Sequence, residues 1–318
     1  MDAIYPNPRR PIDATHFRGA RELFSAYREL SKSGIVALVL ISVLGGYLIG
    51  HPADLPFSPS HLLMTLLGVL FLASGSSALN QFQERTVDAN MPRTAKRPIP
   101  SGRMSAGHAL AFSLGGITLG AILLARLSTE LLALGAAAVL LYNVLYTLWW
   151  KRRWAFAAVP GAVPGALPIL MGYVAASGTL WAAGGWYLFF ILFFWQMPHF
   201  WVLALRFRGD YAQGGFPTLP VSRGTEVTVF QIGLWCLAYV GLALLAPLFL
   251  NVGAFYLAVA IAMGIKLLVE LVRFARQPES QRWLGFFLWV NFSLIILIGA
   301  AALDGWRYQL LAPFWIRG

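Results

Sequence analysis

Asn80, Glu84 and Asp88 lie four residues apart at the end of an apolar run, in a chain in which only 12% of residues are charged. In a helix each step of four residues drifts only about 40°, so the three side chains share one helical face. Acidic groups at the end of a membrane-spanning segment are costly unless they bind something. Because these side chains offer oxygen ligands, the pattern predicts a site for a Mg²⁺ ion.

Further polar residues gather in the same stretch and in or after two later apolar runs. They are Arg93, Arg97, Tyr146, Lys151, Gln196, His199, Arg208, Asp210 and Tyr211. Arg donates paired hydrogen bonds to phosphate oxygens, and Lys supplies a point charge. Diphosphate leaves readily only when its developing negative charge is neutralised, which a metal and basic side chains do together. The residues therefore indicate a magnesium–diphosphate site, and a location inside a membrane favours a polyprenyl diphosphate as the substrate.

The segments that must position these residues are strongly apolar. Mean hydropathy is +0.66, and runs of about 20 apolar residues are long enough to cross a bilayer as helices. The pattern predicts an all-α, polytopic membrane protein, a bundle of nine transmembrane helices. The expected spans are approximately 33–50, 60–80, 107–126, 130–149, 158–178, 182–205, 227–248, 251–273 and 283–303.

The distribution of basic residues predicts the orientation of this bundle. The first 32 residues and the even-numbered connections hold 20 of the 24 Lys and Arg residues, which by the positive-inside rule places the N-terminus in the cytoplasm and the C-terminus outside. We therefore expect a cytoplasmic arm at 1–32 and a single transmembrane domain at 33–318. The net charge of +11 then reflects topology, which excludes nucleic acid as a partner.

Two features allow a purely structural interpretation. The carboxylates could form ion pairs that only orient the spans, namely Glu84 with Arg85, Asp88 with Arg93, and Asp210 with Arg206 or Arg208. Pro160, Pro164 and Pro168 lie on one face of the fifth run. They indicate either a kinked packing helix or free carbonyl groups that face protein or a polar cavity.

The stretch that begins at Asn80 resembles the first motif of the UbiA-type intramembrane prenyltransferase superfamily, in the version of its heme O synthase branch. The matching residues are Asn80, Glu84, Arg85, Asp88, Met91, Arg93, Thr94, Arg97 and Pro98. Later segments fit the same family in the expected order: Tyr146-Thr147 with Lys151-Arg152, Gly165-Ala166 with Pro168 and Gly172, Trp195 to His199, Asp210-Tyr211, and Leu219 to Val221. The segment from Trp195 to His199 is the most specific, because it separates the heme-farnesylating branch from members that act on quinone precursors.

The resemblance implies a Mg²⁺-dependent transfer of a farnesyl group from farnesyl diphosphate to a vinyl group of heme b, giving heme O. Asn80, Glu84 and Asp88 would hold one Mg²⁺, and Asp210 would help with a second. Arg93, Arg97, Lys151 and Arg208 would face the diphosphate, and Tyr146 would donate a hydrogen bond. Gln196, His199 and Tyr211 would contact substrate, with His199 near the heme.

The same resemblance implies a bacterial inner membrane, an active site that faces the cytoplasm, and heme A synthase or a terminal oxidase assembly as partners besides the lipid bilayer. Two departures from the family stand out. Gly209 precedes Asp210 where the family often has a second acid, and Lys32-Ser33 replaces a Lys-Pro pair. Two other functions stay open on the residues alone: prenylation of a quinone-type aromatic acceptor, and a multi-span permease.

Overall fold

The computed structural model describes residues 19–52, 54–278 and 281–315, with side chains described as far as Trp306. Within these ranges the secondary structure is helical, without strands, and nine segments are long and apolar enough to cross a membrane. The predicted nine-span, all-α architecture is therefore confirmed. Residues 1–18 of the expected arm lie outside the described residues, and the cytoplasmic placement of the arm stays a prediction.

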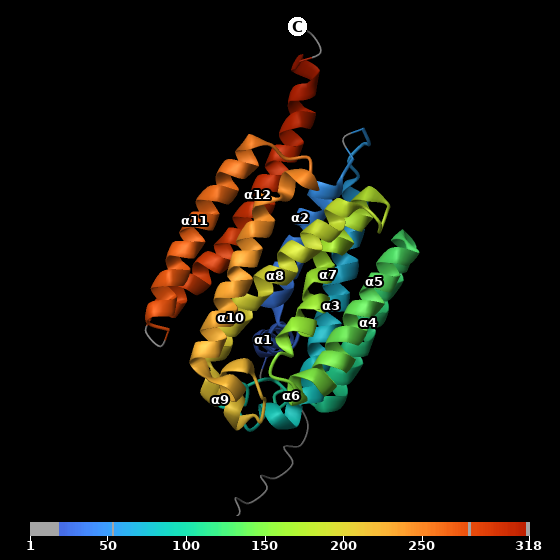
Figure 1. The fold of residues 1–318 in the computed structure, drawn as a ribbon. Helices are drawn as coiled ribbons and strands as arrows, with labels where there is room; N and C mark the ends of the chain where they lie inside the picture. Colours follow the sequence, from blue (N-terminus) through green and yellow to red (C-terminus); the bar gives the residue numbers. More distant parts are fainter. Residues whose placement is uncertain (1–18, 53, 279–280, 316–318) are drawn as a thin grey trace, which may run out of the picture.

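The elements follow one another with short connections. They are α1 (Ala20–Leu30), α2 (Ser33–Gly50), α3 (Pro59–Asp88), α4 (Ala106–Leu127), α5 (Thr129–Val139), η1 (Leu140–Trp150), α6 (Lys151–Arg153), α7 (Ala158–Ser177), α8 (Ala183–Arg206), α9 (Arg208–Gln213), α10 (Leu219–Leu244), η2 (Ala246–Leu248), α11 (Ala254–Arg276) and α12 (Arg282–Trp315). The short helices α1, α6 and α9 lie at one end of the bundle, and α12 projects from the other (Figure 1).

Two spans include polar ends that lie outside their expected bounds. Helix α3 continues to Asp88, so the polar stretch expected after the span forms the last turns of the same helix. Helix α10 begins at Leu219, eight residues before the expected start, and breaks at Gly224, which has φ 81°. Apolarity marks only the part of a helix that lies in the bilayer, so it could not mark these polar ends.

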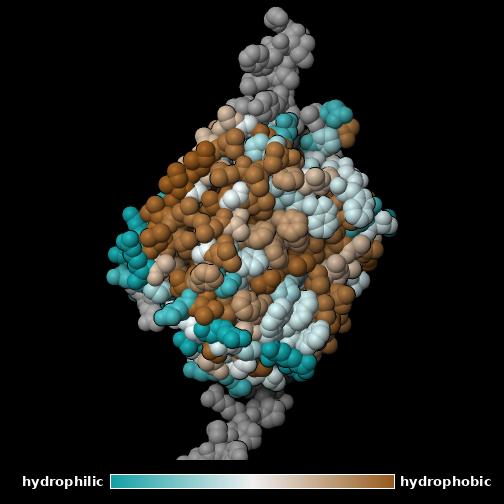
Figure 2. Space-filling model, viewed as in Figure 1, coloured by the Kyte–Doolittle hydropathy of each residue, from teal (hydrophilic) through white to brown (hydrophobic). Residues whose placement is uncertain are grey.

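The outer surface of the bundle is apolar over most of the face shown in Figure 2. Large apolar side chains such as Ile122, Phe230 and Ile265 are exposed on the surface of the bundle. In a water-soluble protein such a surface would drive association, whereas in a bilayer it is the surface that contacts lipid. The polar chemistry must therefore lie inside the bundle or at its ends.

Helices α2 and α7 approach each other closely through glycines. A Cβ atom on Gly46 would lie 2.0 Å from the carbonyl oxygen of Ile169, and one on Gly172 would lie 2.0 Å from that of Val43. Small residues at helix contacts let backbones meet in membranes. This contact fixes α7, which carries Pro164 and Pro168 into the centre of the bundle, where both are buried.

Replacing Gly46 by alanine is expected to destabilise the bundle by about 1–3 kcal/mol, because the added methyl group meets backbone that cannot rotate away. The measurement is thermal unfolding of the purified protein in detergent. Gly241→Ala in α10 is the matched control, since its Cβ would meet nothing within 4 Å. Equal melting temperatures for the two variants would contradict the close contact between α2 and α7.

Candidate active site

Helix α3 is joined to the segment η1 and to the start of α6 by three polar contacts at a constant spacing. Ser76 bonds to Asn143, Asn80 Nδ2 donates to Thr147 Oγ1 at 3.0 Å, and Lys151 Nζ donates to Glu84 Oε1 at 2.6 Å. Each pair is separated by 67 residues along the chain. The partners on the neighbouring segment therefore also follow one another every four residues, as Asn80 and Glu84 do on α3.

The segment η1 is a π-helix, whose wider turns help to present this face. Thr147 Oγ1 donates to the carbonyl oxygen of Tyr142, five residues earlier, at 2.8 Å. Inserted π turns shift the side chains that follow them and are frequent at functional sites. Tyr142 and Tyr146 stack with their ring centroids 6.0 Å apart, and both line the cavity described below.

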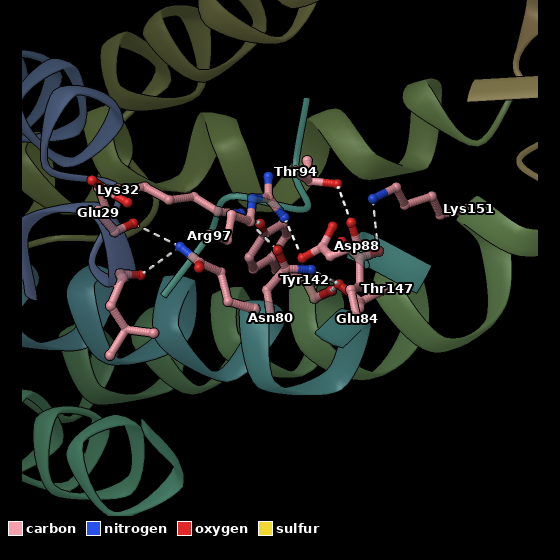
Figure 3. A network of polar contacts seen from close by, with 12 residues as sticks. Glu29, Lys32, Asn80, Glu84, Asp88, Thr94, Arg97, Tyr142, Thr147 and Lys151 are labelled. Atoms are coloured by element: carbon pink, nitrogen blue, oxygen red, sulfur yellow. Dashed lines mark hydrogen bonds and ion pairs between the residues drawn. The ribbon is translucent and has the colours of Figure 1, made fainter. Parts of the chain in front are cut away.

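Each of the three residues predicted to hold the first Mg²⁺ is bonded to a cationic side chain (Figure 3). Lys32 Nζ donates to Asn80 Oδ1, Lys151 Nζ to Glu84 Oε1, and Arg97 Nη1 to Asp88 Oδ2, all at 2.6 Å. Glu84 and Asp88 are 2% and 0% exposed, so these cations offset the large cost of burying their charges.

These pairs differ from the purely structural ion pairs that the sequence left open. Glu84 and Asp88 are paired with cations from other parts of the chain, and Asp210 Oδ2 lies 3.6 Å from Arg93 Nε. Such contacts assemble three segments around one point. This arrangement is typical of a binding site and differs from separate ion pairs that each orient one span.

Asp88 provides the observation that tests the fit of a metal ion. Its Oδ2 accepts from Arg97, but its Oδ1 is buried and has no hydrogen-bond partner among the described residues. A buried carboxylate oxygen without a partner carries a desolvation cost that a bound cation would remove. The loop after α3 is held by a bond from Thr94 Oγ1 to the carbonyl oxygen of Asp88 at 2.9 Å.

The protein alone supplies few ligands for a metal. In the described part of the chain no group of three or more His, Cys, Asp or Glu side chains is arranged to hold an ion. Asn80, Glu84 and Asp88 offer two carboxylates and an amide. That set suits Mg²⁺, which commonly keeps waters and completes its shell with phosphate oxygens of a substrate.

These residues form the polar end of a cavity of about 440 Å³. Its polar end carries the side chains Lys32, Asn80, Glu84, Asp88, Arg93, Arg97 and Lys151, and its deeper part is lined by Val69, Leu72, Ala73, Ala138, Val139 and Met171. Four cations face two carboxylates at the polar end. The cavity is therefore shaped for an anionic head with an apolar tail.

Besides Asn80, Glu84 and Asp88, the structure brings six more predicted substrate and catalytic residues to this cavity: Arg93, Arg97, Tyr146, Lys151, Gln196 and Tyr211. Glycines on α7 make room for two of them. A Cβ on Gly161 would lie 2.6 Å from the Tyr146 ring, and one on Gly165 would lie 2.1 Å from Gln196 Oε1. Gln196 Nε2 donates to the carbonyl oxygen of Ala162 at 3.0 Å, so a polar group and α7 backbone meet at the cavity wall.

Three predicted residues lie outside the cavity lining. Asp210 lies beside it, with its Oδ2 3.6 Å from Nε of the lining residue Arg93. Arg208 lines a separate polar pocket with Arg206 and Trp283. His199 lies between the rings of Trp195 and Phe287, with centroids 4.7 and 5.0 Å away. Its Nδ1 is buried and has no hydrogen-bond partner within the described part of the chain.

Sequence reasoning missed Lys32, which sits in the left-handed conformation (φ 51°) between α1 and α2. Its Nζ reaches Asn80 Oδ1 and the Tyr142 hydroxyl. Burial lowers the pKa of Lys32 to about 8, and Arg97 adds to the effect against the opposing pull of Glu84 and Asp88. Tyr142 was also missed, although its position four residues before Tyr146 was a usable signal.

Comparisons with known proteins agree with this geometry. Residues 39–296 match the UbiA prenyltransferase family. The chain is 47% identical over 285 residues to the protoheme IX farnesyltransferase of Bdellovibrio bacteriovorus, covering 90% of this chain and 98% of that protein. It is 36% identical to the protoheme IX farnesyltransferase of Aquifex aeolicus, covering 89% and 96% of the two chains.

Solved structures share the fold. A UbiA homologue from Aeropyrum pernix superposes with a TM-score of 0.67 at 20% identity, covering 84% of this chain and 98% of that one. A UbiA homologue from Archaeoglobus fulgidus bound to DMAPP and Mg²⁺ gives 0.64 at 16% identity, covering 87% and 99%. With a family match over most of its length and relatives that it covers almost completely, the chain belongs to the UbiA prenyltransferase family.

Proposed function

We propose that the protein transfers a farnesyl group from farnesyl diphosphate to a vinyl group of heme b, giving heme O and diphosphate. The observation that carries the proposal is the cavity with four cations, two buried carboxylates and an apolar depth. The identity of the acceptor is supported by the relatives named protoheme IX farnesyltransferase. Because the family consists of prenyltransferases, transfer is favoured over a permease.

The polar end of the cavity would hold the diphosphate. It is lined by four cationic side chains, those of Arg93, Arg97, Lys32 and Lys151. These side chains would donate hydrogen bonds to phosphate oxygens once their carboxylate and amide partners bind a metal instead. As the bond between farnesyl C1 and oxygen breaks, negative charge grows on the leaving diphosphate, and these fixed cations stabilise it. Tyr146 and Tyr211 flank the same space; burial raises the pKa of Tyr211, which keeps its hydroxyl protonated as a donor.

A Mg²⁺ ion would be held by Asn80, Glu84 and Asp88, and would neutralise the leaving group. The Archaeoglobus fulgidus homologue is bound to Mg²⁺ together with DMAPP or GPP, which supports a divalent metal here. We keep the proposal that Asp210 contacts a second ion. Asp210 lies next to Arg93, which lines the cavity.

The rest of the reaction takes place between C1 of the farnesyl group and the acceptor. The allylic cation at farnesyl C1 is attacked by the terminal vinyl carbon of heme b, which leaves a cation on the other vinyl carbon. Water adds there and loses a proton, so the product carries a hydroxyethylfarnesyl chain. The apolar lining of the cavity excludes bulk water from the first step, which would otherwise hydrolyse the cation.

We propose that the protein lies in the bacterial inner membrane with this end of the bundle toward the cytoplasm, from the positive-inside pattern. The end that carries α1, α6 and α9 also carries the cavity's charged residues (Figure 1). In that setting the product would pass to heme A synthase or to a terminal oxidase during its assembly.

The proposal is tested by incubating the purified protein with heme b, farnesyl diphosphate and Mg²⁺ and measuring the product by mass spectrometry. We expect a farnesylated, hydrated heme. A parallel incubation replaces heme b with a quinone precursor. Product from the quinone precursor and none from heme would overturn the acceptor assignment while leaving prenyl transfer intact.

We propose that His199 contacts the heme. The support is its buried Nδ1, which has no hydrogen-bond partner among the residues that the structure describes, and its aromatic neighbours. His199→Ala is expected to weaken heme binding about tenfold, because it removes the imidazole ring from the acceptor site. The measurement is a heme titration followed by absorbance. His61→Ala is the control, because His61 lies at the start of α3, at the far end of that helix from Asp88. An unaltered titration would return His199 to a packing role.

A further inference from the structure

The apolar end of the substrate cavity is separated from a second apolar pocket by a thin wall. This second pocket, about 290 Å³, lies between α4 and α5 and is lined by residues such as Ile117, Ala121 and Leu132. Leu72 and Val139 line both spaces. Leu140 and Val144, at the outer part of the pocket, are exposed on the surface of the bundle. The second pocket is therefore a side route from the wall toward the lipid.

Leu72 is held in this wall by close packing. It is 5% exposed, and its Cδ2 lies 3.0 Å from the position that a Cβ on Gly135 would take. Leu124 Cδ1 lies 3.0 Å and Met171 Cε 3.8 Å from the same position. The absence of a side chain at Gly135 is what leaves room for Leu72. A buried side chain packed this closely against Gly135 cannot move aside freely for a ligand.

The distance from the charged end of the cavity to this wall lies between the lengths of a farnesyl chain and a geranylgeranyl chain. Helix α3 rises about 1.5 Å per residue, so Leu72 lies about 18 Å along its axis from Glu84. Three bonds of an extended chain span roughly 3.8 Å, so an isoprene unit of four bonds spans about 5 Å, three units about 15 Å and four about 20 Å. A farnesyl tail therefore ends before Leu72, whereas a geranylgeranyl tail reaches it.

We propose that Leu72, together with Val139, sets the upper limit of prenyl chain length by closing the substrate cavity against the pocket between α4 and α5. This inference rests on the proposed function, because it takes the charged end as the diphosphate site. Opening the wall joins the two spaces and lets the last isoprene unit of a longer tail pass toward the lipid.

The test compares geranyl, farnesyl and geranylgeranyl diphosphates as donors to heme b in the wild type, Leu72→Ala and Val139→Ala. We expect the wild type to prefer farnesyl diphosphate. In Leu72→Ala the ratio of kcat/KM for geranylgeranyl over farnesyl diphosphate should rise at least about tenfold, the scale on which a pocket discriminates apolar groups. Leu72→Phe, which thickens the wall, should shift the preference toward geranyl diphosphate.

Leu70→Ala is the matched control, since it removes the same atoms from the same helix at a position that faces a different groove. A wild type that uses the three donors equally, or a ratio that shifts equally in Leu70→Ala and Leu72→Ala, would overturn the proposal. Should Leu72→Ala fail to fold, Val139→Ala and Leu72→Phe carry the test.

Binding of the three diphosphates to the same variants, measured by calorimetry without acceptor, separates this proposal from the proposed function. Failure of heme to accept any tail, with the length preference in binding still shifted by Leu72→Ala, would count against the heme assignment alone. An unshifted length preference in binding would count against the wall.

Discussion

Asp88→Asn is expected to lower the rate of farnesyl transfer by about a hundredfold to a thousandfold, the scale seen when one charge-stabilising group is removed from an active site. The carboxylate is fully buried and bonded to Arg97 through one oxygen, and its other oxygen has no partner in the described ranges of the chain. Asparagine keeps the shape but removes the negative charge that would hold the metal. Turnover of purified protein is the measurement, and heme binding should be unchanged.

The control for Asp88→Asn is Asp54→Asn, the same chemical change at an exposed position in the connection between α2 and α3. Raising the Mg²⁺ concentration should restore part of the activity of Asp88→Asn, because a weakened metal site is filled by mass action. Turnover within twofold of the wild type would refute the role of Asp88 as a ligand.

Lys151→Met is expected to lower kcat/KM for farnesyl diphosphate about a hundredfold. Methionine keeps an unbranched apolar side chain but removes the ammonium group, which bonds to buried Glu84 and lies 4.5 Å from the Phe216 ring centroid. The change removes a cation from the diphosphate end and leaves the Glu84 charge unpaired. Steady-state kinetics with varied farnesyl diphosphate measures it.

Arg152→Met is the matched control for Lys151→Met, because Arg152 is the adjacent basic residue and is exposed to solvent. A double-mutant cycle with Glu84→Gln sharpens the test. If Lys151 and Glu84 act as one unit, the effects of the two changes will be far from additive. Additive effects, or a loss as large in Arg152→Met, would show that Lys151 acts only through general charge.

The face of α3 was predictable because it depends on period alone. Asn80, Glu84 and Asp88 at spacing four must lie on one side of any helix that contains them, and the structure places all three on the cavity. The nine spans were predictable for a similar reason, because apolar length is set by bilayer thickness. Arg93, Arg97 and Lys151 followed from their place at the same end of the bundle.

The positions of Lys32, Arg208 and His199 were not predictable in this way. Lys32 itself adopts a left-handed conformation between α1 and α2, and a sequence pattern does not predict that its side chain then reaches the site. Whether His199 or its neighbour Phe200 faces the cavity depends on the rotation of α8 about its axis, which is fixed mainly by packing against α7 and α10. The structure turns Phe200 and Gln196 to the cavity and His199 to Phe287.

The most direct test of a magnesium–diphosphate site at the end of α3 is calorimetric binding of an unreactive thio analogue of farnesyl diphosphate, with and without Mg²⁺. Because two carboxylates and four cations share that end of the cavity, we predict that Mg²⁺ tightens binding at least about tenfold. Asp88→Asn should abolish that gain. Binding that is equally tight without the metal, or a gain that survives in Asp88→Asn, would contradict the account.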